Sequence, residues 1–465
     1  MKTLKIIVIS LFSLVLLLPM ILFNHKPNAV SQTDNRMLAE SPFSPEVWGK
    51  GEFTENFDKY IEDRIGLREE MILAKTTLYD IFFGEFVHPM YTSGKNDYLF
   101  GSGITTASVV YNSYHERFAL MVKEIQDYCD ARGVPFVFVF NPAKPALYKE
   151  HLPSGINYSR QWVSDFLGRL DKLGVRYVDN TKVLQAQKDN GVAVFNRKYD
   201  PNHWNYIGAY HGTNSVIAEL MKDYPSLKEN TDTDFVLSYE HKETLLQSQY
   251  PINEDVPKIE FVKKAQNDTD KYKDDIYLNK SYANFGYYVN SDRKSEGAPK
   301  LLMFQGSYMN EYGKEFMANA FSEYIHVHDY QNVIDFPYYY NAFKPDCVVF
   351  EVAEYTFMST YFSYEKMGSI NYNPTLASAI NSAEKQEERV LNISEVVVTE
   401  KGEFVEIEWK TTAKADYVWL KLEQEYDFST SSSGFITTVP KQDYLQNTQD
   451  LKIYVKNVDS VVCYS

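Results

Sequence analysis

Three patterns of hydrophobic and polar positions follow one another along this chain. An uncharged apolar run occupies Ile6 to Phe23, helical spacing alternates with short apolar runs through the middle, and alternate positions are apolar beyond residue 390. A helix with one buried face repeats its apolar positions every three or four residues, whereas a half-buried strand repeats them every two. The order therefore predicts an N-terminal membrane helix, an α/β domain and a small C-terminal all-β domain.

The middle of the chain predicts a parallel sheet flanked by helices. Helical spacing from about Ser113 to Ala131 stops at Gly133, a residue that favours the left-handed end of a helix. Further helices are expected at about Gln161 to Leu173 and near Phe57 to Phe83. Continuous apolar runs between helices are typical of parallel strands buried on both faces. The expected strands are 134–140, 175–178, 300–304, 324–328 and 347–352.

The same patterns suggest domain boundaries. We expect an anchor or signal segment at residues 1–30, an α/β catalytic domain at 31–385 and a β-sandwich-like domain at 390–465. Between about residues 224 and 298, polar residues and Tyr dominate and apolar periodicity is poor, which predicts an insertion of loops and short strands. The charged segment Ala383 to Arg389 is expected to end a helix or to connect the two domains.

The N-terminal segment predicts the compartment. Lys2 and Lys5 precede an apolar run of about 18 residues, which is near the minimum length for a membrane-spanning helix. The positive-inside rule then leaves the short N-terminus in the cytoplasm and the rest of the chain outside. A cleavable signal peptide, with Ala29 as a small residue for processing, is the alternative. Both interpretations place the catalytic part outside the cytoplasm.

Composition excludes some classes of partner. The net charge of −16 argues against nucleic acid, because a phosphate backbone requires a basic surface. The three cysteines are widely spaced and form no disulfide or zinc pattern. Nothing in the sequence indicates a metal or nucleotide cofactor.

Two motifs suggest catalytic chemistry. Asp200 stands three residues before His203 at the start of an expected helix, so its carboxylate can orient the imidazole as a general base. The strand predicted at Lys300 to Phe304 breaks at Gly306, which places Ser307 on a strand-to-helix turn where backbone N–H groups can stabilise an oxyanion. We predict the triad Ser307, His203 and Asp200. Each motif alone is weak, because Asp-x-x-His is usually a turn or a helix cap.

Other segments accompany these motifs in a fixed order. They are Asp34 to Ala39, Phe57 to Arg68, Gly94 to Phe100, Asn141 to Lys144 with Leu152-Pro153, and Lys344 to Glu354. In content and order the chain, from roughly Asp34 to Phe357, resembles the alginate O-acetyltransferase-related group of SGNH-hydrolase-like proteins. In that group an Asp-His pair beside a Trp precedes the catalytic Ser. The resemblance implies an SGNH-hydrolase-like α/β fold.

The chain departs from the pattern of that family at two places. The family usually has one residue between Asp and His, whereas Pro201 and Asn202 both intervene here. The family Ser usually follows Gly-Asp, whereas Ser307 follows Gln305-Gly306. The second departure bears on the oxyanion geometry and leaves room for a member that only binds.

The resemblance implies an O-acetyltransferase that modifies hydroxyls of a cell-surface or secreted polysaccharide through an acyl-serine. Acetyl-CoA is cytoplasmic, so the resemblance also implies a membrane-bound O-acyltransferase as the acetyl donor. Two alternatives stay open. The same triad can hydrolyse acetyl esters, and the altered Gln-Gly-Ser turn fits a non-catalytic glycan-binding or assembly protein.

Further residues are candidates for binding. Asn141 and Gly306 are possible oxyanion or substrate ligands, and Trp204 and Asn205 are expected to shape or line the site. Glu351 and Glu354 fit either general acids or partners for Arg or Lys. Some members of the family carry a carbohydrate-binding module at the C-terminus, so Tyr417, Trp419 and Trp409 are candidates for stacking on sugar rings. A structural domain without sugar binding is equally compatible.

Overall fold

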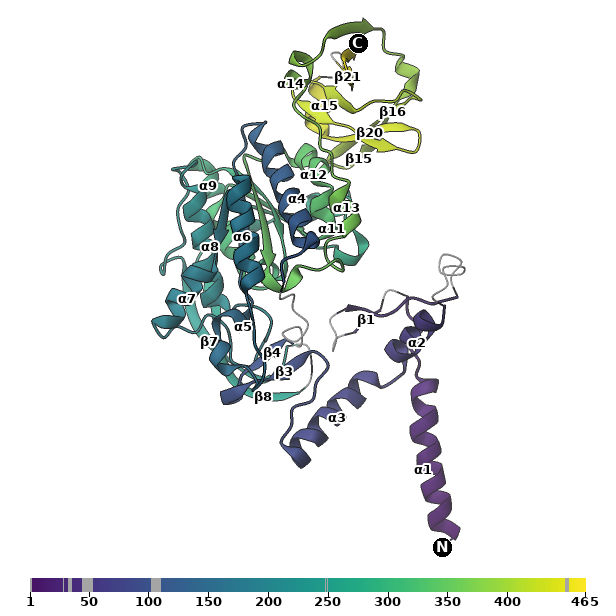
Figure 1. Ribbon diagram of the computed structural model, residues 1–465, viewed down its shortest axis with the longest axis vertical. Coiled ribbons are helices and arrows are strands. Elements are labelled where there is room, and N and C mark those ends of the chain that lie inside the picture. The colour runs from purple at the N-terminus through teal and green to yellow at the C-terminus, as the bar shows by residue number, and fades with distance from the viewer. Residues whose placement is uncertain are drawn as a thin grey trace.

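The computed structural model shows an α/β body with a helical N-terminal arm and a C-terminal strand-rich domain (Figure 1). The structure describes residues 2–27, 29–31, 36–43, 53–101, 110–246, 248, 250–447 and 451–465. Of the family-like segment Asp34 to Ala39, Asp34 and Asn35 lie outside the described residues.

The body is built on one mixed sheet, in the strand order β6-β5-β13-β11-β12-β10-β9. The first five of these strands are parallel and the last two pair antiparallel. Their bounds are β5 Phe136–Asn141, β6 Tyr177–Asp179, β9 Gln266–Asn267, β10 Phe285–Val289, β11 Lys300–Gln305, β12 Glu323–His328 and β13 Cys347–Ala353. The expected parallel sheet is therefore confirmed, and its strands fall within two residues of the predicted bounds.

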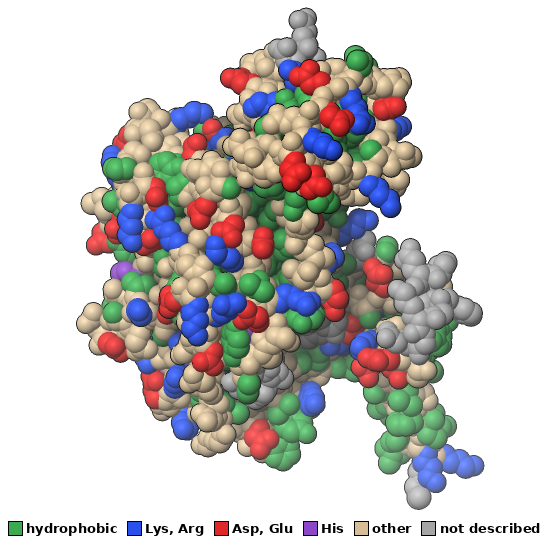
Figure 2. All heavy atoms as spheres, turned by 45° about the horizontal axis from the view of Figure 1, so that its top comes forward, with side chains coloured by type: hydrophobic (Ala, Val, Ile, Leu, Met, Phe, Trp, Pro, Cys, Tyr) green, Lys and Arg blue, Asp and Glu red, His purple; other side chains and the backbone are tan. Residues whose placement is uncertain are grey.

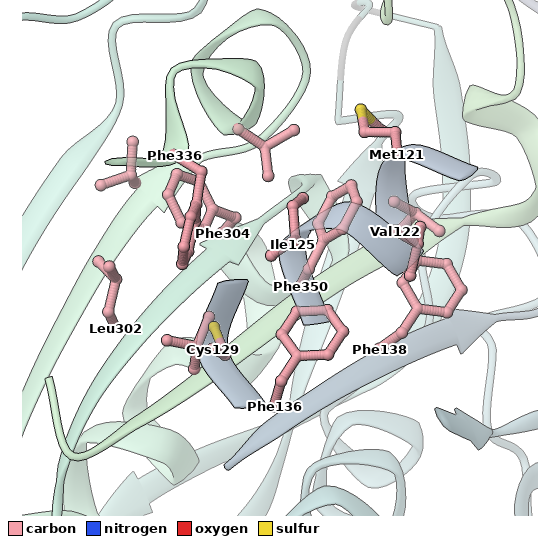
Figure 3. Packing of buried hydrophobic residues seen from close by; sticks show 14 of the residues in the cluster. Met121, Val122, Ile125, Cys129, Phe136, Phe138, Leu302, Phe304, Phe336 and Phe350 are labelled. Carbon is pink, nitrogen blue, oxygen red and sulfur yellow. The ribbon is translucent and has the colours of Figure 1, made fainter. Parts of the chain in front are cut away.

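Helices cover both faces of the sheet, as the apolar strands require. Along β5, Phe136, Phe138 and Phe140 pack on one face, while Val137 and Val139 pack on the other. The first face is covered by α4 (Ser113–Asp130), α6 (Gln161–Leu173) and α12 (Phe336–Phe343), and the second by α7 (Thr181–Asp189), α8 (Tyr206–Leu220) and α10 (Lys314–Ala320). Figure 3 shows the first face, where side chains of α4 meet aromatic rings of the sheet. This is the layered α/β architecture of the SGNH-like fold.

The insertion differs from its prediction. Two long strands, β7 (Phe235–Thr244) and β8 (Pro251–Phe261), form an antiparallel hairpin where only loops and short strands were expected. Most side chains of β7 are exposed, so this strand lacks the apolar alternation of a half-buried strand. The rest of the insertion adds β9 and β10 to the edge of the main sheet.

The N-terminal arm contains α1 (Lys2–Ile21), α2 (Phe53–Arg64) and α3 (Arg68–Phe83). Within the described residues, α1 is the one helix long and apolar enough to cross a membrane. The single helix expected near Phe57 to Phe83 is two helices. They break at Gly66 and Leu67, because Leu67 has φ 59° and a Cβ at Gly66 would lie 2.5 Å from Leu22 Cβ.

The C-terminal domain is a sandwich of two sheets, β14-β22-β21-β17-β18 and β15-β16-β20-β19. Its strands are β14 Lys385–Arg389, β15 Val396–Lys401, β16 Phe404–Lys410, β17 Tyr417–Lys421, β18 Glu425–Asp427, β19 Ser429–Ser431, β20 Gly434–Pro440, β21 Lys452–Asn457 and β22 Ser460–Tyr464. The segment interpreted as a connector is thus strand β14, which pairs in parallel with β22. A buried ion pair of 3.2 Å between Arg132 and Asp427 fastens the sandwich to α4.

Shorter elements complete the chain. They are β1 Val30–Ser31, β2 Arg36–Met37, β3 Tyr91–Ser93, β4 Leu99–Gly101, α5 Lys144–Leu147, α9 Ser291–Ser295, α11 Gln331–Ile334, α13 Tyr364–Gly368, α14 Leu376–Asn381 and α15 Lys441–Gln446.

Candidate active site

The Asp-x-x-His motif forms a tight hydrogen-bonded pair on the loop that leads into α8. His203 Nδ1 lies 2.6 Å from Asp200 Oδ1, and both side chains are buried. A carboxylate only accepts hydrogen bonds, so Nδ1 carries the proton and Nε2 is left as the basic nitrogen. The other oxygen, Asp200 Oδ2, accepts a 2.9 Å hydrogen bond from the Tyr312 hydroxyl. The pair lies on the loop between α7 and α8, directly before a helix as expected and not at the end of a strand.

Three backbone N–H groups hold this loop in place. Those of Arg197, Lys198 and Tyr199 donate to the carboxylate of Glu254 on β8, at 2.6, 2.8 and 2.7 Å. Asp200 follows directly with φ 50°, in the left-handed region that Asp and Asn tolerate better than most residues. The hairpin of the insertion therefore supports the loop that carries the Asp-His pair.

A buried lysine ties the same loop to the rest of the domain. Lys144 Nζ donates to the carbonyls of Leu99 at 2.5 Å and of Arg197 at 2.9 Å. Burial lowers the pKa of Lys144 to about 7. Its contacts are to backbone, so Lys144 connects β4 with the His203 loop.

The two members of the pair shift one another's pKa in the directions a charge relay requires. Burial alone would lower the pKa of His203, but the neighbouring Asp200 carboxylate outweighs it and raises that pKa above its usual value. Burial would likewise raise the pKa of Asp200, but His203 and Tyr312 outweigh it and lower that pKa. His203 is therefore a stronger base than a free imidazole, and Asp200 stays ionised.

The predicted nucleophile lies on the expected strand-to-helix turn. Strand β11 ends at Gln305, and Ser307 opens a helical segment that passes through a π-turn at Met309–Gly313 into α10. Trp204 Nε1 donates 3.0 Å to the carbonyl of Tyr308, and the rings of His203 and Tyr308 lie 5.6 Å apart. The structure thus brings the His203 loop against the Ser307 turn.

Ser307 has a hydroxyl partner that the sequence did not suggest. Its Oγ lies 2.7 Å from the Tyr355 hydroxyl. Within the described part of the chain, no hydrogen bond joins Ser307 to His203. Tyr355 comes two residues after the end of strand β13, so the hydroxyl that holds Ser307 Oγ is delivered from the neighbouring strand.

A buried glutamate occupies both predicted oxyanion ligands. Glu351 Oε2 accepts from the Gly306 N–H at 2.8 Å, and Oε1 accepts from Asn141 Nδ2 at 2.6 Å. The other amide atom of Asn141 accepts from Asn180 Nδ2 at 2.7 Å. Burial raises the pKa of Glu351 to about 7, although both donors and His203 oppose it. The Gly306 N–H and one of the two N–H bonds of Asn141 Nδ2 are therefore engaged with Glu351.

The same surroundings explain the Gln-Gly-Ser sequence. A Cβ at Gly306 would lie 3.4 Å from Asp329 Oδ2 and 3.7 Å from Glu351 Oε2. An aspartate at this position, as in the family pattern, would add a third carboxyl group to two that are already buried. Glycine avoids that repulsion.

The remaining candidates next to His203 have structural partners. Asn205 caps α8, with Oδ1 accepting from the N–H groups of Ile207 and Gly208, both at 3.0 Å. Trp204 is fully buried between α8 and Tyr308. Both residues position the His203 loop from within the fold.

The other acid singled out in the sequence pairs with arginine. Glu354 Oε1 lies 2.9 Å from Arg160 Nε and also accepts from the Tyr158 hydroxyl at 3.1 Å. Of the two interpretations given for it, the structure supports the partner of a basic residue.

The aromatic candidates of the C-terminal domain are mostly core. Trp409 and Trp419 are 2% and 0% exposed, and Trp419 Nε1 donates to the carbonyl of Pro374 at 3.0 Å. Tyr417 is half-buried, and its hydroxyl donates to Asn371 Oδ1 at 2.9 Å. The two indoles have no open face for a sugar ring in this structure.

The sequence reasoning missed four residues around the triad: Glu254, Tyr312, Lys144 and Tyr355. Tyr312 lies five positions after Ser307, where the π-turn directs it back to Asp200. Tyr355 comes directly after Glu354 in a segment already noted for its acids. The link from Glu254 to the loop spans more than fifty residues and left no pattern along the chain.

Comparison with known proteins confirms the family resemblance. Residues 92–273 match the family model of the SGNH hydrolase-like domain of the acetyltransferase AlgX, a span that contains Asp200 and His203 and ends before Ser307. A stretch of 108 residues, 22% of this chain, is 33% identical to the probable alginate O-acetylase AlgJ of Pseudomonas aeruginosa and spans 26% of that protein.

Two solved structures align over more of the chain. Bacillus cereus PatB1 aligns with a TM-score of 0.44 and 14% identity, over 57% of this chain and 96% of PatB1. The O-acetyltransferase domain of Pseudomonas putida AlgJ aligns with a TM-score of 0.40 and 14% identity, over 60% of this chain and 98% of the domain. The sequence similarity to the AlgX domain model and to AlgJ is confined to parts of the chain, and the chain spans about a quarter of the length of AlgJ.

Proposed function

We propose that this protein is an extracytoplasmic O-acetyltransferase that acetylates hydroxyls of a cell-surface or secreted polysaccharide through an acyl-serine. The observation that carries the proposal is the buried Asp200–His203 pair, which the Trp204–Tyr308 hydrogen bond holds against the turn of Ser307. Arranged in this way, an ionised carboxylate, a basic imidazole and a hydroxyl at a helix start suit acyl transfer.

The first half-reaction acylates Ser307. His203 Nε2 takes the hydroxyl proton as Ser307 Oγ forms a bond to the acetyl carbonyl carbon, and the departing group of the donor takes that proton from His203. The Gly306 N–H and one N–H of Asn141 are engaged with Glu351, so we assign the oxyanion to other donors. The candidates are the N–H groups that open the helix at Ser307 and the Tyr355 hydroxyl, which lies 2.7 Å from Oγ.

The second half-reaction moves the acetyl group to a sugar. His203 takes the proton of the acceptor hydroxyl, whose oxygen attacks the acetyl carbonyl, and Ser307 Oγ recovers the proton when its ester bond breaks. Water in place of the sugar would make the same site an esterase. We assign the sugar because the matched family model is that of an acetyltransferase.

The acetyl donor and the membrane belong to the same proposal. The mean hydropathy of α1 and its length of 20 residues suit a single membrane span. We infer that the catalytic domain lies outside the cytoplasm and receives acetyl groups from a membrane-bound O-acyltransferase.

The experiment is acyl-enzyme trapping on the full chain in detergent. Incubation with an activated acetyl ester should add one acetyl group to a peptide containing Ser307, detected by mass spectrometry, and an oligosaccharide acceptor should remove it faster than water does. Ser307→Ala should abolish the adduct and lower turnover by several orders of magnitude. Tyr361→Phe, a hydroxyl deletion outside the triad, is the matched control.

Three outcomes separate the alternatives. Equal deacylation with and without acceptor would favour an esterase. An adduct that persists in Ser307→Ala would move the nucleophile elsewhere. No adduct on the wild-type chain with any activated ester, together with binding of the oligosaccharide, would favour a non-catalytic glycan-binding protein.

A further inference from the structure

The C-terminal end of α3 exposes a group of large apolar side chains. Ile81, Phe82 and Phe83 are 68%, 71% and 68% exposed, and Leu78 and Tyr79 one turn earlier are also exposed. Isolated exposed apolar side chains are common, whereas a contiguous group of this kind marks a surface that meets another apolar phase. We call these five residues the α3 tip.

The opposite end of α3 is fixed to the apolar helix α1. The Gly66 N–H donates to the carbonyl of Pro19 at 2.9 Å, and the Asn24 N–H donates to the carbonyl of Arg64 at 2.8 Å. Buried Arg64 also donates to the carbonyls of Asn24 and Lys26, at 3.1 and 2.7 Å. Helix α3 therefore starts at the point where α1 ends, with a set direction.

That direction returns the tip toward the membrane side. From the upper end of α1, helix α3 slopes down and away from α1, so that its C-terminal end lies toward the same lower end of the view as the N-terminus of α1 (Figure 1). Figure 2 shows hydrophobic surface on α1 and again on the neighbouring projection at that end. Since α1 leaves the bilayer at its outer surface, α3 starts close to that surface, and its 16 residues, about 24 Å long, are enough to bring the tip back to it.

The composition of the tip suits the boundary between headgroups and acyl chains. Two Phe, one Tyr and two aliphatic residues surround Asp80, and the rings of Tyr79 and Phe83 lie 5.4 Å apart. Aromatic side chains are enriched at membrane interfaces, where helices bury such residues without spanning the bilayer. Asp80 lies within the tip and Glu85 follows it, and both are acidic. Burial of apolar side chains in the bilayer therefore explains membrane insertion better than attraction to anionic lipid.

We propose that the α3 tip inserts into the outer surface of the same bilayer that α1 spans, and so holds the catalytic domain at the membrane by two points. The chain enters the catalytic domain through β3 and β4 directly after the tip. A second anchor there would fix the tilt of the α/β body against the membrane. This inference goes beyond the proposed chemistry and depends only on α1 as a membrane helix.

The test is site-directed spin labelling of the full chain in phosphatidylcholine vesicles. Cys129 and Cys347 are buried, so replacing half-exposed Cys463 with Ser leaves a background for Phe82→Cys. The control is Val458→Cys, which is 80% exposed on the distant C-terminal domain. The label at position 82 should be more accessible to oxygen than to a water-soluble nickel complex, and the control label should show the reverse.

Each other outcome overturns the proposal. Equal nickel accessibility at the two positions would leave the tip in water. Spin–spin broadening at position 82 that disappears on dilution with unlabelled chain would show that a second copy covers the tip. Release of the wild-type chain from vesicles by alkaline carbonate would remove the membrane premise. None of these results depends on acetyl transfer, so failure of the proposed function would be seen separately in acyl-enzyme trapping.

Discussion

Asp200 and Asp329 are both buried near the Ser307 turn, yet their pKa values are shifted in opposite directions. Asp200 is 2% exposed and has a partner for each oxygen, His203 and Tyr312. Asp329 is 0% exposed, and neither of its side-chain oxygens has a hydrogen-bond partner in the described part of the chain. The pKa of Asp200 lies below its usual value, while burial and then the neighbouring Glu351 raise that of Asp329 well above it.

The comparison shows that partners decide the charge of these acids more than depth does. Burial favours the neutral form of every carboxyl group, and only a nearby cation or a set of donors reverses that preference. Glu351 is the intermediate case, since it has two donors and a pKa of about 7. The site thus combines one acid that favours its charged form, one that favours its neutral form and one with a pKa of about 7.

The largest expected effect, on turnover, comes from removing the negative charge of Asp200 beside His203. Asp200→Asn should keep the fold, because Asn also tolerates a φ of 50°. The amide would favour the wrong imidazole tautomer, and turnover should fall by up to about four orders of magnitude, as in protease triads. Activity requires neutral His203, whose pKa Asp200 raises, so the acid limb of kcat/KM should move to lower pH in the variant.

Turnover, its pH profile and the thermal midpoint on one preparation check this prediction. Asp179→Asn, on β6 outside the pair, is the control. Near-normal turnover in Asp200→Asn would mean that Asp200 only shapes the loop, because Asn satisfies a turn or a cap as well as Asp does.

Asp200 could be predicted from the sequence because its partner, His203, is close to it along the chain. Asp200 and His203 are three residues apart, and the strand that delivers Ser307 is a continuous apolar run. The helices and parallel strands followed for the same reason, since periodicity is a property of neighbouring residues. The exact break of α2 from α3 was missed, because it depends on the approach of Leu22 to Gly66 from far along the chain.

The surroundings of Asp329 and Glu351 could not be predicted in this way. Asp329 ends up beside Gly306 only through the pairing of β11 with β12, and Glu351 only through the pairing of β11 with β13. The same holds for Glu254, whose strand was expected to be a loop, and for the two buried indoles of the C-terminal domain. The position of a polar residue in the sequence does not show whether its side chain will be hydrogen-bonded, charged or exposed.

A smaller effect, on stability, is expected from Glu351→Gln, which replaces this acid by a neutral amide. The folded state binds the Glu351 proton more tightly than the unfolded state does, so the contribution of Glu351 to stability is greatest below pH 4.5 and falls as the pH rises to about 7. The span corresponds to about 3 kcal/mol of unfolding free energy. Gln cannot ionise, so this decline should be absent from the variant.

Urea unfolding of the wild type and of Glu351→Gln at pH 5 and pH 8 measures this pH dependence of stability. The variant should gain about 3 kcal/mol relative to the wild type between the two pH values, whatever its offset at pH 5. Glu243→Gln, an exposed position on β7, should show a difference below about 0.5 kcal/mol. A constant difference between Glu351→Gln and the wild type would mean that Glu351 keeps one charge state throughout.

The smallest effect on turnover is expected at Asp329, whose side-chain oxygens have no hydrogen-bond partner in the described part of the chain. Burial and Glu351 raise the pKa of Asp329 well above its usual value, so Asp329→Asn replaces a carboxyl that favours its neutral form by a neutral amide of nearly the same shape. The folded state holds the Asp329 proton more tightly than the unfolded state does, so the wild type should lose stability relative to Asp329→Asn as the pH rises from 5 to 8. His328 Nδ1 lies 3.4 Å from Asp329 Oδ1, but burial lowers the pKa of His328 to about 4, so no ion pair is lost. Turnover should stay within a few-fold of the wild type, in contrast to Asp200→Asn. A loss of turnover comparable to that of Asp200→Asn would show that Asp329 is ionised and acts on the Ser307 turn, which would reverse the comparison between the two buried aspartates.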